Sequence, residues 1–190
     1  MIFFKRYKAK TDADLVAMAS KGDQGAFNEI INRHHTAVYK FALYLVKDPL
    51  GAEDITQEVF FKLHQKGENF KPDSALKTFL LTITRNLCAD FFRKNRLVMA
   101  DESPEEVYDK TPFKQLHIAE LRKQIGEIYS SLPEKQQVAL YLHHEQGMSY
   151  KEAADAMGIT TSSLNSLLSR GRKEFKDKFS NSCMEGIPEL

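Results

Sequence analysis

The chain has 190 residues, 42% of them hydrophobic, and 27 lysines and arginines nearly balance 26 aspartates and glutamates, for a formal net charge of +1. This length and apolar content allow one large or two small domains with cores of their own, without disulfide staples. Only two cysteines occur, Cys88 and Cys183, far apart in the sequence, which argues against a disulfide framework or a metal knuckle and favours a reducing compartment.

The start of the chain lacks the pattern of a targeting segment. The apolar residues 1–4 are followed at once by basic residues, so there is no apolar signal-peptide core, and no apolar run elsewhere reaches membrane-spanning length. We therefore expect a cytoplasmic protein in which residues 1–10 form a loose basic tail.

Helical periodicity dominates residues 11–96, which we expect to form one domain. Thr11 and Asp14 have the spacing of a capping box for a short helix ending at Ala19, and Gly22-Asp23 should stop that helix and cap the next. Helical spacing then recurs over 24–46, about 51–65 and about 75–96, with breaks at Asp48-Pro49 and at 67–74. The predicted inward residues of the first long helix are Phe27, Ile30, Ile31, Val38, Phe41 and Leu45.

The helical period disappears over 97–112, where acidic residues and prolines have the composition of a solvated linker. If largely extended, this linker could separate two domains by roughly 40–50 Å, at about 3.3 Å per residue. Beyond it we expect a second helical domain over 113–180, with helices over 113–130 and 134–145, and a tail over 181–190. No stretch alternates with the period of a strand, so the predicted fold class is all-α, in two small helical domains.

The second domain contains a helix-turn-helix pattern between Met148 and Lys178. Ser149 and Glu152 have capping-box spacing, Gly158 permits a tight turn, and Thr160 or Ser162 can cap a second helix. Apolar residues recur along that helix at helical spacing: Leu164, Leu167, Leu168 and Phe175.

Short polar side chains at the start of the second helix can approach base edges in a major groove, and basic side chains further along can contact phosphates. These candidate DNA-binding residues are Thr161, Ser162, Ser163, Asn165, Ser166, Arg170, Arg172 and Lys173, with Lys176 and Lys178 beyond them. A solvated helical domain whose Ser/Thr cluster is merely a cap fits the same residues.

A second candidate nucleic-acid surface lies at the end of the first domain. Basic and amide groups beside aromatic rings suit single-stranded or opened nucleic acid, where bases stack on rings and cations hold phosphates. The residues are Asn69, Phe70, Lys71, Arg85, Asn86, Asp90, Arg93 and Lys94. A solvated helix face explains them equally well, and Phe91 and Phe92 fit a core as readily as an exposed position.

Three further segments complete a longer pattern: 22–27 (GDQGAF), 52–60 (AEDITQEVF) and 79–86 (FLLTITRN). With Leu132-Pro133, the segment 147–154 (GMSYKEAA) and the helix-turn-helix, they resemble bacterial sigma factors of the sigma-70 family, whose motifs read GD..AF, AED..QEVF and WL..IARN. The chain is most similar to the compact extracytoplasmic-function group, which keeps only two domains. Each motif is weak alone, but coincidence does not readily explain their order and spacing.

The resemblance implies a role for each surface. In that family the AED..QE helix docks on the clamp of core RNA polymerase, although a solvated acidic face fits the periodicity as well; the corresponding residues are Glu53, Asp54, Gln57 and Glu58. The end of the first domain would recognise the melted minus-ten promoter element, and the helix from Thr161 would read the minus-thirty-five element as duplex. The acidic run from Asp101 to Asp109 would thread through the active-site cleft and RNA exit path of the polymerase.

The chain departs from the family at two places. Where the recognition helix of the family often reads Val-Lys-Ser-Arg, this chain has Leu164-Asn165-Ser166-Leu167, which removes two positive charges and should lower phosphate affinity. Phe79 replaces the tryptophan of WL..IARN, an exchange that an aromatic core position tolerates.

No catalytic, cofactor or metal site is predicted. The pairs His34-His35 and His143-His144 cannot chelate one ion together, because adjacent helical side chains point about 100° apart. Cys88 among apolar residues fits a buried side chain better than a nucleophile. No glycine-rich phosphate loop is present either.

We therefore expect a non-enzymatic sigma factor that binds core RNA polymerase and promoter DNA and serves a stress or envelope-response regulon, with an anti-sigma factor, in this family sometimes membrane-bound, as a further partner. The alternative is a free-standing helix-turn-helix regulator with an N-terminal sensor or dimerisation domain. The AED..QEVF segment and the presence of a single helix-turn-helix disfavour it, because such regulators usually dimerise and place two helix-turn-helix motifs on a palindromic site. A small helical enzyme would be a third class, but no residue pattern in the sequence indicates one.

Overall fold

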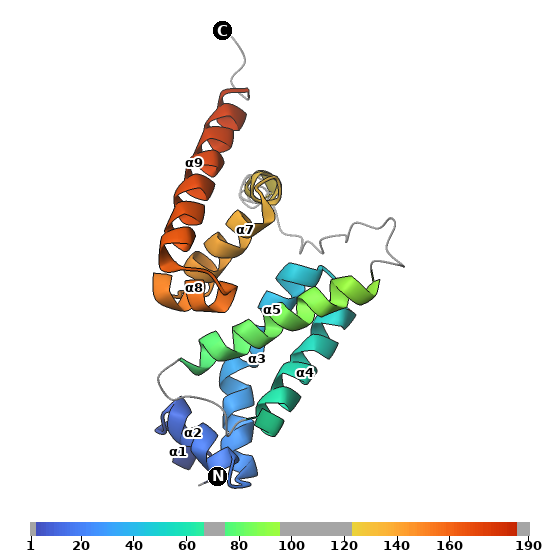
Figure 1. The fold of residues 1–190 in the computed structure, drawn as a ribbon, viewed down its shortest axis with the longest axis vertical. Coiled ribbons are helices and arrows are strands. Elements are labelled where there is room, and N and C mark those ends of the chain that lie inside the picture. Colours follow the sequence, from blue (N-terminus) through green and yellow to red (C-terminus); the bar gives the residue numbers. More distant parts are fainter. Residues whose placement is uncertain (1–2, 67–74, 96–122, 186–190) are drawn as a thin grey trace, which may run out of the picture. The chain divides into compact units, whose positions relative to one another are not determined.

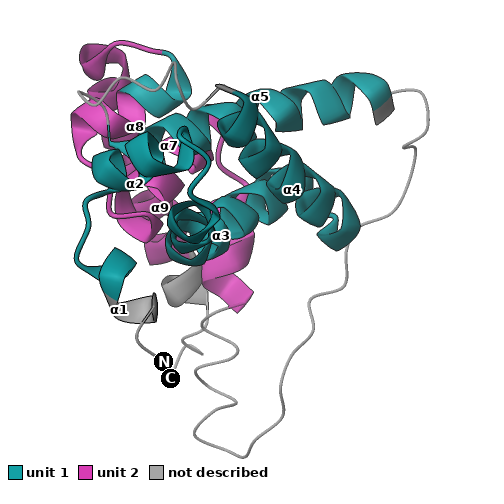
Figure 2. Cartoon of the chain, turned by 90° about the horizontal axis from the view of Figure 1, so that it is seen from below, with its two compact units in different colours: residues 1–104, 155–158 teal, residues 105–154, 159–190 magenta. Residues whose placement is uncertain are grey.

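The structure is a computed structural model, and it describes residues 3–66, 75–95 and 123–185. Within these ranges the regular elements are all helices, as the sequence predicted. Residues 1–104 with 155–158 form one compact unit, and residues 105–154 with 159–190 form the other (Figure 2). The predicted linker over 97–112, including Asp101 to Asp109, lies outside the described residues.

The first unit is a bundle built around one long helix (Figure 1). The long helix α3 packs against α2, α4 and α5, and α4 also packs against α5. The helices are α1 (Phe3–Lys8), α2 (Asp12–Ala19), α3 (Gln24–Val46), α4 (Pro49–Lys66) and α5 (Leu76–Asn95). Side chains that recur at helical spacing fill its core: Leu15, Ile30, Val38, Phe41, Val59, Leu63, Leu76 and Leu80 are all buried.

The predicted caps of the first helices are confirmed. The Asp14 backbone N–H donates to Thr11 Oγ1 at 3.1 Å and the Thr11 N–H donates to the Asp14 carboxylate at 3.2 Å, which is a complete capping box. Asp23 caps α3 by accepting from the Ala26 N–H at 3.0 Å. These hydrogen bonds stabilise the ionised carboxylates of Asp14 and Asp23, and they therefore lower the pKa of both groups.

The expectation of a loose tail is wrong for the described residues 3–10, because α1 is helical and packs on α3. The Arg33 guanidinium of α3 donates to the backbone carbonyls of Tyr7 at 2.9 Å, Lys8 at 3.1 Å and Lys10 at 2.9 Å. Tyr7 also donates its hydroxyl to Asp23 at 3.0 Å. A long-range arginine thus satisfies the carbonyls at the end of a helix that is too short to be stable alone.

The break at Asp48-Pro49 starts the next helix as well as ending the previous one. Lys47 adopts a left-handed conformation with φ 55° and closes α3. Pro49 is then the first residue of α4, two residues before the predicted start, and the Asp48 carboxylate accepts from the N–H groups of Leu50 and Gly51 at 3.1 Å each. Proline suits this position because the first helical N–H has no partner within the helix.

Residues 123–185 contain a helical segment over residues 123–130, α7 (Glu134–Leu140), the π-helix η2 (Tyr141–Glu145), α8 (Tyr150–Met157) and α9 (Thr161–Glu185); all but the end of α8 belong to the second unit. The predicted helix over 134–145 is present, but its last five residues have π geometry. Of the predicted helix over 113–130, the part before 123 lies outside the described residues. Helix α9 continues to Glu185, past the predicted start of a tail at 181, because Gly186 and Pro188 are the first breakers after Gly171.

Helices α7 and α9 pack against each other (Figure 1), and Gly171 of α9 lies at their contact. A Cβ on Gly171 would lie 3.0 Å from Leu140 Cδ1 and 3.4 Å from Gln136 Cβ. Leu164 and Leu168 of α9 are fully buried on the same side. The exposed side of α9 is thereby fixed relative to the rest of the second unit.

Candidate nucleic-acid interface

The helix-turn-helix is built by local signals that the structure confirms. Ser149 Oγ and Glu152 hydrogen-bond at 2.7 Å, and the Ser149 N–H donates to the same carboxylate at 2.9 Å, so the predicted capping box opens α8. Gly158 ends the helix at φ 64°, a conformation that costs glycine little. Thr160, one of the two predicted caps, caps α9 by accepting from the Ser163 N–H at 3.1 Å.

The polar side chains predicted to read bases are all exposed at the start of α9: Thr161, Ser162, Ser163, Asn165 and Ser166. Two of them already have partners, since Ser163 Oγ bonds Thr160 Oγ1 at 2.8 Å and Ser166 Oγ donates to the Ser162 carbonyl at 3.1 Å. Across the described part of the chain, the side chains of Thr161, Ser162 and Asn165 have no hydrogen-bond partner. These three can accept or donate to a ligand without breaking an internal bond.

The basic residues of α9 up to Lys176 are exposed, and the basic side chains of this helix differ in their hydrogen-bond partners. Arg170 Nε donates to the Ser166 carbonyl at 3.2 Å along its own helix, and both Nη atoms of Arg172 lie 3.4 Å from the Tyr150 hydroxyl. Lys173 is exposed. Lys178 instead pairs with Glu174 at 3.2 Å and bonds Ser131 Oγ at 2.8 Å, so it is engaged inside the second unit.

The candidate surface at the end of the first unit lies on α5. Arg85 is half-buried and its Nη2 donates to Asn86 Oδ1 at 3.1 Å, while Arg93 pairs with Asp90 within the helix. Lys94 is exposed. Asn69, Phe70 and Lys71, the other residues predicted for this surface, lie outside the described residues.

The structure separates the two adjacent phenylalanines of α5. Phe91 is half-buried against α4, where a Cβ on Gly51 would lie 2.8 Å from its ring, whereas Phe92 is 43% exposed. The two rings meet edge to face with centroids 6.0 Å apart. Of these two rings, Phe92 is the one that is exposed to solvent beside the basic side chains of α5.

Helix α4 carries the predicted acidic set on one side. Asp54 and Gln57 are exposed, and Glu53 and Glu58 are half-exposed, with Glu58 paired to Lys62 at 3.3 Å. The spacing of 54, 57 and 58 places these three on one face of the helix. They can therefore meet one partner surface together.

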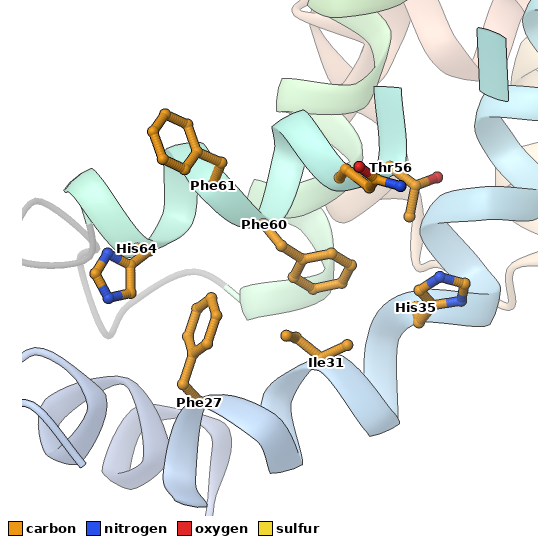
Figure 3. Close-up of a pocket in the computed structure, with 8 residues that line it drawn as sticks. Phe27, Ile31, His35, Thr56, Phe60, Phe61 and His64 are labelled. Carbon is orange, nitrogen blue, oxygen red and sulfur yellow. The ribbon is translucent and has the colours of Figure 1, made fainter. Parts of the chain in front are cut away.

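An apolar groove of about 500 Å³ runs between α3 and α4 beside this acidic face (Figure 3). Rings define it: Phe27 packs edge-on against His64 at 5.3 Å between centroids, and His35 stacks on Phe60 at 6.3 Å. Phe61, also in the lining, is 56% exposed. The remaining lining residues are Ile31, Thr56 and Gln57.

Sequence reasoning missed this groove because Phe27 and Ile31 were predicted to be core residues. Both are half-buried and line the open side of α3 instead. The adjacent pair Phe60-Phe61 was the available signal, because neighbouring helical residues point about 100° apart and cannot both face one core. Gln57 belongs both to the acidic face and to the groove, so the two form one continuous surface.

His34, His143 and Cys88 lie outside these surfaces, and packing or hydrogen bonds within the described residues account for each of them. His34 is buried and its Nε2 lies 2.8 Å from Asp12, and His143 Nδ1 lies 2.8 Å from the Met148 carbonyl. Cys88 is 2% exposed, and burial raises its pKa to about 12. Among the described residues, no three His, Cys, Asp or Glu side chains are grouped as metal ligands. None of the described helices combines the length and the apolar character that crossing a bilayer requires.

Comparison with known proteins gives matches to both units. A family model described as Sigma-70 region 2 matches residues 30–98, and one described as Sigma-70, region 4 matches residues 122–175. The chain is similar to the ECF RNA polymerase sigma factor SigE of Mycolicibacterium smegmatis, 29% identical over 165 residues that cover 82% of this chain and 63% of that protein. It is also similar to the ECF RNA polymerase sigma factor SigM of Bacillus subtilis, 28% identical over 151 residues, 78% of this chain and 92% of that protein.

Among solved structures, the fold matches that of the sigma factor RpoE in complex with the anti-sigma factor NepR from Bartonella quintana. The TM-score is 0.65 with 24% sequence identity, over 81% of this chain and 96% of that one. At this identity the match establishes a shared fold.

Proposed function

The chain belongs to the sigma-70 family of RNA polymerase sigma factors, in its extracytoplasmic-function group, and from this premise we propose which of its surfaces carry out transcription initiation. One observation carries the proposal: both family matches contain the expected helix. The region-4 match contains the exposed helix α9, capped by Thr160, and the region-2 match contains the acidic helix α4. A free-standing regulator would need neither region 2 nor its acidic helix.

Core RNA polymerase is the proposed partner of α4. The acidic residues Glu53, Asp54 and Glu58 favour a basic partner surface, and Gln57 connects them to the apolar groove. Phe61, more than half exposed at the groove, can add apolar burial at the centre of such an interface. An amphipathic helix with an apolar ridge and basic flanks fits this surface best.

Promoter DNA is the proposed partner of α5 and α9. The α5 set of Arg85, Asn86, Asp90, Arg93 and Lys94, with Asn69, Phe70 and Lys71, would hold the opened minus-ten strand. The α9 set of Thr161, Ser162, Ser163, Asn165, Ser166, Arg170, Arg172 and Lys173 would read the minus-thirty-five duplex. The acidic linker from Asp101 to Asp109 would occupy the nucleic-acid path of the polymerase.

Neither DNA surface should bind tightly alone. Asn165 and Leu167 replace positive residues frequent in the family, and Arg93 is paired with Asp90, so each surface has little free positive charge for phosphates. Tethering both surfaces to the polymerase raises the effective concentration of the second contact once the first has formed. Selective promoter binding is therefore expected of the holoenzyme.

Regulation by an anti-sigma factor belongs to the same proposal. A protein of this fold is bound by the anti-sigma factor NepR, and an exposed apolar groove beside an acidic face is a surface that an inhibitor could cover to exclude the polymerase. We place the protein in the cytoplasm with the polymerase, as a non-enzymatic initiation factor of a stress or envelope-response regulon.

Transcription with purified components tests the function. The chain is added to core RNA polymerase on a library of genomic fragments, and transcript starts are mapped. We expect starts that depend on the chain and share upstream sequence elements. Starts that are unchanged by adding the chain would refute the function. Filter binding should show weak DNA binding by the chain alone, and tight, salt-insensitive binding without polymerase would contradict the tethering argument.

A charge reversal tests the α4 surface separately. Asp54→Lys should weaken binding of the labelled chain to core polymerase about tenfold, because it places a like charge opposite a basic partner. Glu127→Lys, the same charge change at an exposed position of the second unit, is the matched control. Equal affinities for Asp54→Lys and the unmodified chain would remove α4 from the interface.

A further inference from the structure

Tyr150 and Arg172 lie 22 positions apart in the sequence and meet across the helix-turn-helix. Both terminal nitrogens of the Arg172 guanidinium lie 3.4 Å from the Tyr150 hydroxyl oxygen. Arg172 is otherwise exposed on α9, and Tyr150 is the first residue of α8. The contact therefore links the first helix of the motif to a cation of the recognition helix.

Tyr150 is itself held firmly enough to orient another side chain. Its ring is half-buried and packs edge-on against His143, with centroids 4.9 Å apart at 79°. His143 is in turn fixed by the 2.8 Å contact between its Nδ1 and the Met148 carbonyl. The capping box at Ser149 fixes the backbone immediately before Tyr150. The phenol thus has a defined position before any ligand binds.

Arg172 lies on the same exposed stripe of α9 as two of the proposed base readers. Positions 162, 165, 169 and 172 are all exposed and follow one another at spacings of three and four, opposite the buried Leu164 and Leu168. Arg172 is seven residues beyond Asn165, about 10 Å along the helix axis. When the start of the helix enters a major groove, a cation at that distance lies near the phosphates at the groove edge.

We propose that Tyr150 is a positioning residue for duplex binding. Its hydroxyl holds the Arg172 guanidinium on the DNA-facing stripe, so that the arginine side chain is already ordered when it contacts a phosphate. A free arginine loses rotamer freedom when it binds, and a preorganised one loses less. The inference rests on the proposed function, because it assumes that α9 binds duplex DNA.

The test measures binding of holoenzyme, assembled from core polymerase and the full chain, to a duplex fragment carrying a promoter recovered in the transcription assay above. Tyr150→Phe keeps the ring against His143 and removes only the hydroxyl. We expect it to weaken binding about threefold to tenfold, the range for one lost hydrogen bond. The slope of log affinity against log salt should stay unchanged, because the charge that contacts the phosphate is still present.

Arg172→Ala distinguishes positioning from other roles. It should weaken binding and lower the salt slope by about one phosphate contact. Adding Tyr150→Phe to Arg172→Ala should then have no further effect, because the hydroxyl would have nothing left to position. Tyr129→Phe is the matched control: it removes the 2.7 Å bond from the Tyr129 hydroxyl to the Gln137 carbonyl, away from Arg172, and should leave DNA affinity unchanged.

Three outcomes oppose the inference. Additive losses from Tyr150→Phe and Arg172→Ala would show that the phenol acts independently of the arginine. A loss with Arg172→Ala and none with Tyr150→Phe would overturn the positioning role and leave the duplex surface standing. No loss with Arg172→Ala, while Thr161→Ala or Asn165→Ala weakens binding, would remove Arg172 from that surface. Chain-dependent transcription is measured in parallel, so that failure of the proposed function itself is recognised separately.

Discussion

Replacing Arg33 by methionine tests how the N-terminal helix is held. The guanidinium donates to three backbone carbonyls at and just beyond the end of α1 and to two carboxylates, Asp12 at 3.1 Å and Glu29 at 3.0 Å. The Arg33 side chain is 25% exposed, so each of these bonds contributes less than a fully buried one. Methionine preserves much of the aliphatic packing and removes every donor.

The magnitude follows from these contacts. A net hydrogen bond contributes about 1 kcal/mol, exposed ion pairs contribute about 0–1 kcal/mol, and carbonyls released at a surface regain water, so docking of α1 should weaken by about 2 kcal/mol. Each 1.4 kcal/mol is a factor of ten in an equilibrium, so the undocked population should rise roughly thirtyfold. Trypsin cleavage after Arg6, Lys8 or Lys10 should accelerate by a similar factor if opening is fast relative to cleavage.

The assay is limited trypsin digestion of the full chain, with N-terminal fragments followed by mass spectrometry. Lys62→Met is the matched control, because it removes one ion pair with Glu58 and, among the described residues, no long-range hydrogen bond or ion pair. Arg33→Lys should weaken the docking of α1 almost as much as Arg33→Met, since one ammonium cannot bridge three carbonyls. If Arg33→Met is cleaved at the rate of the unmodified chain, Arg33 does not dock α1 and the physical account of that helix fails.

Three further predictions address the second unit and the buried thiol. Thr160→Ala removes the acceptor of the Ser163 N–H and should destabilise the second unit by about 1 kcal/mol in thermal unfolding, whereas the exposed Ser162→Ala should not; equal shifts would show that Thr160 is no cap. Burial and the neighbouring His143 and Arg172 lower the pKa of His144 from 6.5 in the folded chain. The unfolded chain therefore binds more protons at His144, and the free energy of unfolding should decrease as the pH falls below about 6.5. His144→Gln should reduce that pH dependence, and parallel stability curves for the two proteins would contradict it. In a Cys183→Ser background, Cys88 should react with a thiol reagent far more slowly in the native chain than in urea, since its thiol is buried with a pKa of about 12; equal rates would refute its burial.

Much of the fold could be predicted because its signals are local. The capping boxes at Thr11 and Ser149 and the turn at Gly158 each depend on residues within a few positions. Helix α3 begins and ends where its apolar period does. The helix α1 could not be predicted in this way, because the donor that satisfies its carbonyls comes from position 33. Composition alone made residues 1–10 look like a solvated tail.

The candidate surfaces were predictable in their residues but not in their contacts. Exposure of the Ser/Thr/Asn cluster on α9 follows from its helical spacing opposite Leu164 and Leu168. The pairing of Lys178 with Ser131 and the contact between Arg172 and Tyr150 involve residues far apart in sequence, and no periodicity predicts them. The groove between α3 and α4 was hidden for a related reason: a period of 3.6 marks an apolar side, but not whether another element covers it.

These contacts bear on how strongly the recognition helix can act alone. Of the basic side chains on α9, Lys178 is tied to Glu174 and Ser131 and cannot reach a phosphate without breaking those bonds. Arg170 lies along its own helix, and Asn165 and Leu167 bring no charge. On the proposed function, duplex affinity therefore depends on few cations, so the orientation of Arg172 matters more than it would on a helix rich in free lysine and arginine. A chain with this arrangement should lose promoter selectivity sharply when the polymerase tether is removed, and only modestly when a single base-facing serine is replaced.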